Sequence, residues 1–244
     1  MLLVRSLIFQ AYFFVSVSLF AAAVFVCWPL PFGVRFGLAR SWAASMLWAG
    51  RVICGFEYVV EGRENIPLQP SVIMIKHSTV FEAYAQLTAF PPQTWVVKRE
   101  LTWIPIFGWG LAALKPIAID RKAGHTAVSQ VIEQGREKLA QGIWVTIFPE
   151  GTRVLPGVVK KYGVSGAALA ADTRCPVVPV AHNAGDLWPR RSLIKRPGLI
   201  RFCIGPAVDS TALSPREINE AVRQWIDAKM AEISGGGRSA DRRP

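Results

Sequence analysis

The sequence predicts an α/β fold: a mixed, mostly parallel sheet flanked by helices, behind an N-terminal two-helix hydrophobic membrane module. From Phe56 onward, short apolar stretches alternate with longer helical patterns. Polar side chains follow directly on several of these stretches, as they do at the ligand-binding edge of a parallel sheet. We therefore divide the chain into membrane-anchoring helices at 1–55, an α/β domain at 56–234 and a disordered basic tail at 235–244.

The first helix is predicted from a long uncharged run. No charged residue stands between Arg5 and Arg35, and Ser6 to Trp28 is apolar almost throughout. At 1.5 Å per residue this run reaches roughly 35 Å, enough to cross a bilayer core of about 30 Å. A cleaved signal peptide is the alternative, but the length of the run and the arginines that follow disfavour it. We expect a retained membrane anchor.

A second helix is expected at about Val34 to Cys54. Its apolar face is formed by Trp42, Met46, Ala49 and Ile53. Arg40 and Arg51 share the opposite side, which is typical of a helix lying on a membrane surface. Packing of this helix on the α/β domain is the alternative.

The predicted elements of the α/β domain alternate along the chain. Strands are expected at Phe56–Val60, Val72–Ile75, Thr94–Val97, Pro116–Ile119, Ile143–Phe148, Pro176–Ala181 and Leu199–Ile204. Helices are expected at Thr79–Ala89, Thr126–Ala140, Lys160–Asp172 and Pro215–Ile233.

The charge and cysteine content narrow the class of partner. With 28 Lys and Arg against 17 Asp and Glu, the net charge is +11, which favours an anionic partner surface. Anionic lipid is favoured over nucleic acid, because basic residues follow an apolar anchor and no nucleic-acid motif is present. The four cysteines are scattered and form no Cys-x-x-Cys pair, so we predict neither disulfides nor zinc and a cytosolic globular part.

His77 follows a buried strand and precedes a helix. Ser78 or Thr79 is a candidate helix cap, and the spacing from Thr79 to Glu82 is that of a capping box. The adjacent helix N-terminus disfavours the imidazolium, so a neutral His77 can accept a proton while Glu82 holds its other ring nitrogen. In the alternative interpretation, Glu82 is only a cap and His77 a structural residue.

Cations and a tight turn follow other strands. Lys98, Arg121 and Arg153 come after three further strands, where they can gather around His77 and bind a phosphate. The Phe148 to Arg153 stretch runs from a strand into Pro149 and Gly151, which favours a tight turn from which Glu150 and Arg153 project. An ordinary polar turn with a surface ion pair is the alternative. His125 and His182 lack metal-ligand spacing, so no metal site is predicted.

Four ordered blocks carry a resemblance to a known family. They are His77-x-x-x-x-Glu82, Gly108-Trp109 with Ile119-Asp120-Arg121, Phe148-Pro149-Glu150-Gly151-Thr152-Arg153 and Val177-Val178-Pro179-Val180. The sequence resembles the glycerolipid acyltransferases, in particular the bacterial 1-acylglycerol-3-phosphate acyltransferases, over roughly 56–206. The family usually has Asp where this chain has Glu82, which leaves another lysolipid, such as a lyso-ornithine lipid, open as the acceptor.

The resemblance implies roles for individual residues. His77 would take the proton of the acceptor hydroxyl as it attacks an acyl thioester, and Glu82 would orient His77. Lys98, Arg121 and Arg153 would hold the lysolipid phosphate, and Glu150, Gly151 and Thr152 would shape the acceptor site. The resemblance implies neither a metal nor another cofactor.

The expected function is acyl transfer from acyl-CoA or acyl carrier protein to lysophosphatidic acid, giving phosphatidic acid. The expected partners are membrane lipids, lysophosphatidic acid and the acyl donor, and the expected place is the cytosolic face of the inner membrane. A non-catalytic membrane-docked lipid-binding protein is the alternative from another class. A hydrolase would need a nucleophile, and none is set up beside His77.

Overall fold

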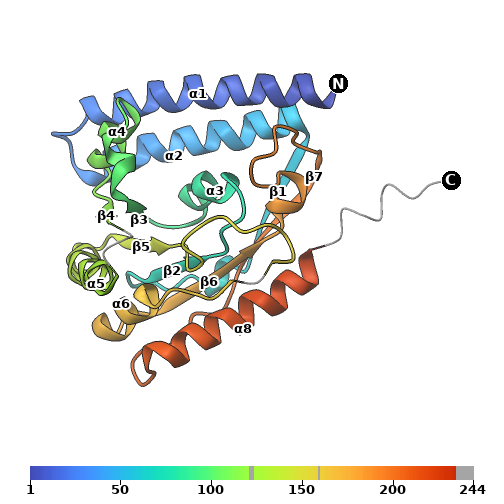
Figure 1. Cartoon of the computed structure of the whole chain (residues 1–244). Coiled ribbons are helices and arrows are strands. Elements are labelled where there is room, and N and C mark those ends of the chain that lie inside the picture. Colours follow the sequence, from blue (N-terminus) through green and yellow to red (C-terminus); the bar gives the residue numbers. More distant parts are fainter. Residues whose placement is uncertain (121–123, 159, 235–244) are drawn as a thin grey trace.

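A computed structural model describes residues 1–120, 124–158 and 160–234, and these residues form a seven-stranded sheet (Figure 1). The strand order is β1-β7-β6-β2-β5-β3-β4. All neighbouring strands are parallel except β6 and β7, which are antiparallel. The strands are β1 (Phe56–Glu61), β2 (Val72–Ile75), β3 (Gln93–Lys98), β4 (Ile117–Ile119), β5 (Trp144–Ile147), β6 (Val177–His182) and β7 (Gly198–Ile204). The predicted mixed, mostly parallel sheet is confirmed.

Helices cover both faces of the sheet (Figure 1). They are α1 (Leu2–Val26), α2 (Phe32–Ala49), α3 (Phe81–Ala89), α4 (Phe107–Ala113), α5 (His125–Ala140), α6 (Ser165–Thr173), α7 (Ala184–Leu187) and α8 (Pro215–Ile233). One apolar core lies between the sheet and α1, α2 and α3, and a second lies between the sheet and α5, α6 and α8. The central strands β2, β5 and β6 are buried along their whole length, which explains why they are mostly apolar rather than alternating.

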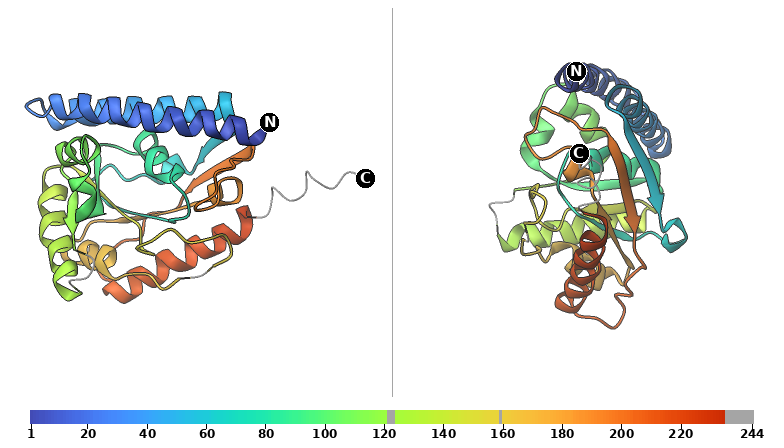
Figure 2. Two further views of the ribbon diagram at one scale, coloured as in Figure 1. Left: turned by 45° about the horizontal axis from the view of Figure 1, so that its top comes forward. Right: turned by 90° about the vertical axis from the view of Figure 1, so that its right-hand side faces the viewer.

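Helix α1 lies lengthwise across the domain beside α2, and the two form one layer in both views of Figure 2. Near its start, the ring of Phe9 is buried against Phe56 and Trp188. Towards its end it packs on α4 so closely that a Cβ on Gly110 would lie 2.5 Å from the carbonyl oxygen of Ala21. Of the described helices, α1 is the one long and apolar enough to cross a membrane. Its outward face is apolar and exposed.

The arginines of α2 do not form the expected outward basic face. Arg35 is buried and donates a hydrogen bond of 2.7 Å to the carbonyl of Ala113, at the end of α4. Arg40 donates to the carbonyls of Leu87 and Phe90, at the end of α3. The C-terminus of a helix has carbonyls without intrahelical partners and a partial negative charge. The two arginines supply hydrogen-bond donors to these carbonyls and a compensating positive charge. Helix α2 is therefore packed on the domain at these side chains. Of the two arginines expected on the outward basic face, Arg40 is held in this way, whereas Arg51, just beyond the end of α2, is exposed.

Most expected element boundaries hold within a few residues. Helix α3 begins at Phe81, two residues after the expected Thr79. Helix α6 begins at Ser165 rather than near Lys160, and α2 ends at Ala49, followed by a π-helical turn to the expected end at Cys54. The short helices α4 and α7 were not predicted. Residues 235–244, expected to be a disordered tail, lie outside the described residues.

Candidate active site

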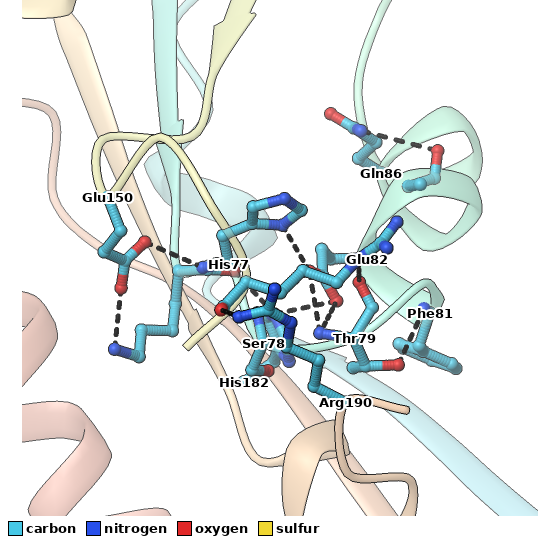
Figure 3. A network of polar contacts seen from close by, with 12 residues as sticks. His77, Ser78, Thr79, Phe81, Glu82, Gln86, Glu150, His182 and Arg190 are labelled. Carbon is cyan, nitrogen blue, oxygen red and sulfur yellow. Dashed lines mark hydrogen bonds and ion pairs between the residues drawn. The ribbon is translucent and has the colours of Figure 1, made fainter. Parts of the chain in front are cut away.

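Strand order places three polar strand ends side by side. Strand β2, which leads into His77, is hydrogen-bonded to β6 on one side and to β5 on the other. Both pairings are parallel, so the three carboxyl ends lie at one edge of the sheet. The side chains that follow them meet there, as Figure 3 shows for His77, Glu150 and His182.

His77 and Glu82 form the predicted pair. The Nδ1 atom of His77 lies 2.8 Å from Oε1 of Glu82, which is fully buried in the first turn of α3. The Phe148 ring stacks on the imidazole at 4.2 Å between centroids and 23° between planes, which fixes the plane of the ring. Because an ionised carboxylate only accepts hydrogen bonds, Nδ1 carries a hydrogen, and in the neutral imidazole Nε2 is then the nitrogen with the lone pair.

Glu82 is also the acceptor for the start of α3. Its carboxylate accepts backbone hydrogen bonds from Ser78 (3.0 Å) and from Thr79 (3.0 and 3.1 Å). The hydroxyl of Thr79 accepts from the Phe81 N–H instead of closing the expected capping box. The two sequence interpretations of Glu82, as a cap and as the partner of His77, are therefore compatible in one geometry.

The charge state of Glu82 follows from these contacts. Burial alone would raise the pKa of this carboxyl, but the neighbouring His182 and the hydrogen bond from His77 hold the pKa below its usual value. Glu82 is thus ionised at neutral pH. A fixed anion on Nδ1 stabilises the imidazolium that forms when Nε2 takes a proton.

Glu150 faces inward rather than projecting from its turn. Its carboxylate accepts hydrogen bonds from the Lys76 ammonium at 2.6 Å and from the backbone N–H of His77 at 2.9 Å. Both side chains of this ion pair are buried. Glu150 therefore fixes the backbone at His77, and the alternative of a surface ion pair was wrong for this residue. The sequence interpretation had assigned no role to Lys76.

The predicted tight turn is present at Gly151. This glycine has φ +65°, which favours a residue without a Cβ. Thr152 is half-buried next to it. Beyond the turn, the Nε–H of Arg153 donates to the carbonyl of Thr79 at 2.9 Å, and Arg190 donates to the carbonyl of Arg153. Arg153 is thereby held beside the loop that carries His77.

The other two predicted cations are placed differently. The Lys98 side chain is 48% exposed and pairs with Glu100 at 2.8 Å. Arg121 lies outside the described residues. The structure thus brings Arg153, of the three expected cations, next to His77.

An apolar cavity of about 460 Å³ lies beside His77, within the size range of small-molecule sites. His77, Phe148 and Arg153 lie along its polar part. Its apolar walls come from α1, α2, α3, α4 and β3, and they include Phe13, Phe20, Trp42, Leu87, Trp95 and Leu111. Within the described ranges, no group of three or more His, Cys, Asp or Glu side chains could hold a metal ion.

Comparison with known proteins gives consistent results. The sequence model of the Acyltransferase family matches residues 57–183. The chain is 42% identical to the 1-acyl-sn-glycerol-3-phosphate acyltransferase of Pseudomonas aeruginosa, covering 95% of this chain and 92% of that protein. It is 27% identical to the human 1-acyl-sn-glycerol-3-phosphate acyltransferase alpha, over 77% of this chain and 69% of that one.

A solved structure has the same fold. The crystal structure of the 1-acyl-sn-glycerophosphate acyltransferase from Thermotoga maritima aligns with a TM-score of 0.79, at 22% sequence identity. The alignment covers 95% of each chain, so it includes the N-terminal helices as well as the sheet.

Proposed function

Since this chain belongs to the acyltransferase family, we propose that it transfers an acyl chain from a thioester to the free hydroxyl of lysophosphatidic acid, giving phosphatidic acid. The observation that carries the proposal is the cavity, whose apolar walls end at a histidine–glutamate pair and an arginine. This combination suits an amphiphile with a hydrocarbon chain, a reactive hydroxyl and an anionic head group.

The proposed chemistry starts at His77. Its Nε2 takes the proton from the acceptor hydroxyl as the oxygen attacks the thioester carbonyl, and Glu82 stabilises the resulting imidazolium. The carbon–sulfur bond then breaks, and the imidazolium returns the proton to the leaving thiolate. His77 thus takes up one proton and gives it back in the same turnover, so this route needs neither an acyl-enzyme nor a second acid–base group.

Arg153 is proposed to bind the phosphate. It lines the same cavity as His77, and its Nε–H is already engaged by Thr79, which leaves the terminal guanidinium nitrogens for an anion. Lys98 and Arg121 are proposed as secondary cations, and Gly151 and Thr152 as the turn that sets the position of Arg153. Glu150 is proposed to act through the backbone of His77 rather than by touching the acceptor.

The outer face of α1 is proposed to hold the protein at the membrane, with the active site on the cytosolic side. Its exposed side chains include Leu7, Phe14, Val15 and Leu19. The packing of one face of α1 along the domain favours a helix lying in one leaflet over one crossing both, because this face already contacts protein.

The test is a product analysis with purified protein in vesicles. Radiolabelled acyl-CoA and acyl carrier protein thioesters are offered separately with lysophosphatidic acid or with a lyso-ornithine lipid. We expect labelled phosphatidic acid, and we expect His77→Ala to lower turnover by about 10²–10⁴-fold in a folded protein. Acylation of the lyso-ornithine lipid alone would show that lysophosphatidic acid is the wrong acceptor. Turnover by His77→Ala close to that of the wild type would refute the mechanism.

A further inference from the structure

A second histidine lies against Glu82, on the side away from His77. His182 ends β6 and is fully buried. Its Nε2 atom is 2.8 Å from the carbonyl oxygen of Lys76 and 3.5 Å from Oε2 of Glu82 (Figure 3). His77 contacts the other carboxylate oxygen, Oε1. Glu82 therefore lies between two imidazoles that come from neighbouring strands.

The contacts of His182 define its tautomer. Both groups near Nε2 are acceptors, so Nε2 carries the hydrogen. The Nδ1 atom is buried and has no hydrogen-bond partner among the described residues, which suits a ring nitrogen without a proton better than one that must donate. The ring also lies parallel to that of Phe202, with 11° between the planes. The geometry thus fits the Nε2–H tautomer of His182, with this N–H directed at the His77–Glu82 site.

We propose that His182 is a positioning residue for the proton transfer, acting on His77 through Glu82 and through the Lys76 carbonyl. The proposal rests on the proposed function. The carbonyl of Lys76 belongs to the peptide that leads into His77, so a hydrogen bond to it fixes the backbone at the base. The N–H facing Oε2 restrains the carboxylate, whose other oxygen orients the His77 ring.

Groups on three sides of the His182 ring define its surroundings. From β2, the Lys76 ammonium is engaged by Glu150, and from α3 the carboxylate of Glu82 faces the ring. On the β7 side, the neighbour is the apolar ring of Phe202. The N–H of His182 consequently draws electron density from Glu82 and reduces the pull of this anion on the His77 proton. Without this N–H, the Glu82 carboxylate attracts the His77 N–H more strongly.

The test compares three substitutions at one position. His182→Phe keeps a flat ring against Phe202 but removes the N–H, whereas the amide nitrogen of His182→Gln extends to the place of Nε2. We expect His182→Phe to lower kcat about tenfold, with the KM for lysophosphatidic acid changed by less than about twofold. The acid limb of its kcat/KM profile should move to higher pH, and His182→Gln should restore both. His182→Asn, whose amide is too short, should behave like His182→Phe.

Val178→Ala, a buried substitution on the same strand, controls for lost stability. Wild-type kcat and an unmoved acid limb in folded His182→Phe or His182→Asn would refute the proposal. So would an equal loss of kcat in Val178→Ala at an equal melting temperature, because the role would then be structural only.

Nitrogen-15 NMR gives a test that does not depend on turnover. The chain has 3 histidines, so ring signals can be assigned by single substitutions. We expect His182 protonated at Nε2 and a changed His77 ring signal in His182→Phe. A proton on Nδ1 of His182 would overturn the proposal even if the protein acylated no lysolipid. Wild-type turnover, measured separately, decides the proposed function alone.

Discussion

Replacing Glu82 by Gln separates the charge of this residue from its shape. The carboxylate accepts hydrogen bonds from three donors, Nδ1 of His77 and the N–H groups of Ser78 and Thr79, and Nε2 of His182 lies 3.5 Å from Oε2. In the better orientation, the amide oxygen of Gln replaces Oε1 and keeps three of these contacts. Its NH₂ group then replaces Oε2, where it meets the N–H of Thr79 and of His182, 3.1 and 3.5 Å away. The NH₂ group of Gln is itself a donor, so it cannot accept from either of these two N–H groups.

This geometry sets the expected magnitudes. Losing charge-assisted contacts in a buried site costs about 1–3 kcal/mol, so Glu82→Gln should lower the melting temperature as well as turnover. An amide stabilises the His77 imidazolium far less than an anion does, so kcat should fall at least about 10²-fold. Glu82→Asp keeps the charge but is one methylene shorter, and it should retain intermediate activity with the same loss of contacts at the start of α3.

The pH dependence of stability provides a second measurement. The pKa of Glu82 is lowered in the folded protein, so its ionised form contributes stability above the ordinary carboxyl range. This contribution is lost as pH falls through the lowered value, and Glu82→Gln should lack that part of the acid loss. Turnover is measured by product formation and stability by thermal unfolding at several pH values. Wild-type kcat in Glu82→Gln, with only the melting temperature lowered, would show that Glu82 is a cap and not the partner of His77.

Two further predictions concern the head group and the membrane. Arg153→Ala should raise the KM for lysophosphatidic acid by about 10–100-fold, while Lys98→Ala, which lies in an exposed pair with Glu100, should change it by less than about threefold. Kinetics with varied acceptor and saturating donor would measure this, and a larger effect of Lys98→Ala would reverse the assignment. The double substitution Phe14→Glu and Leu19→Glu should release the protein from vesicles, since burying each of these apolar side chains in the bilayer is worth about 1.5–3 kcal/mol. The melting temperature should not fall, because the two side chains are 60% and 66% exposed in the folded protein. Vesicle flotation measures binding, with Leu68→Glu, at a fully exposed site outside α1, as the control; undiminished binding of the double variant would exclude the outer face of α1 as the anchor.

The sequence predicted the strands well because their signals are local. The central strands are short apolar runs bounded by turns, and α8 begins at a capping box of Ser214 and Glu217 with Pro215 in its first turn. Helix α4 escaped prediction because Pro105 and two glycines obscure its short pattern, and it is held by packing on α1. The start of α6 was misplaced because the preceding loop is fixed by tertiary contacts, such as the hydrogen bond from Gly163 to Pro149.

The same distinction applies to the site. His77 and Glu82 are five residues apart, so one strand end and one helix start suffice to place them together. Lys76 with Glu150 and His182 with Glu82 require β5 and β6 to flank β2, and periodicity does not determine strand order. The polar residues after the sixth strand were a visible signal, but their role depended on knowing which strand lies beside which.

The structure also changes the explanation of the basic front of the chain. Arg40 was expected, with Arg51, on a face turned to anionic lipid, yet Arg40 and the neighbouring Arg35 bind carbonyls at the ends of α3 and α4, two helices that border the cavity. Their charges therefore help to hold the cavity walls together instead of attracting a bilayer. The outer face of α1 is apolar, so insertion of side chains rather than surface charge is the contact that it offers to lipid. It follows that high salt should weaken vesicle binding far less than the paired Glu substitutions on α1 do.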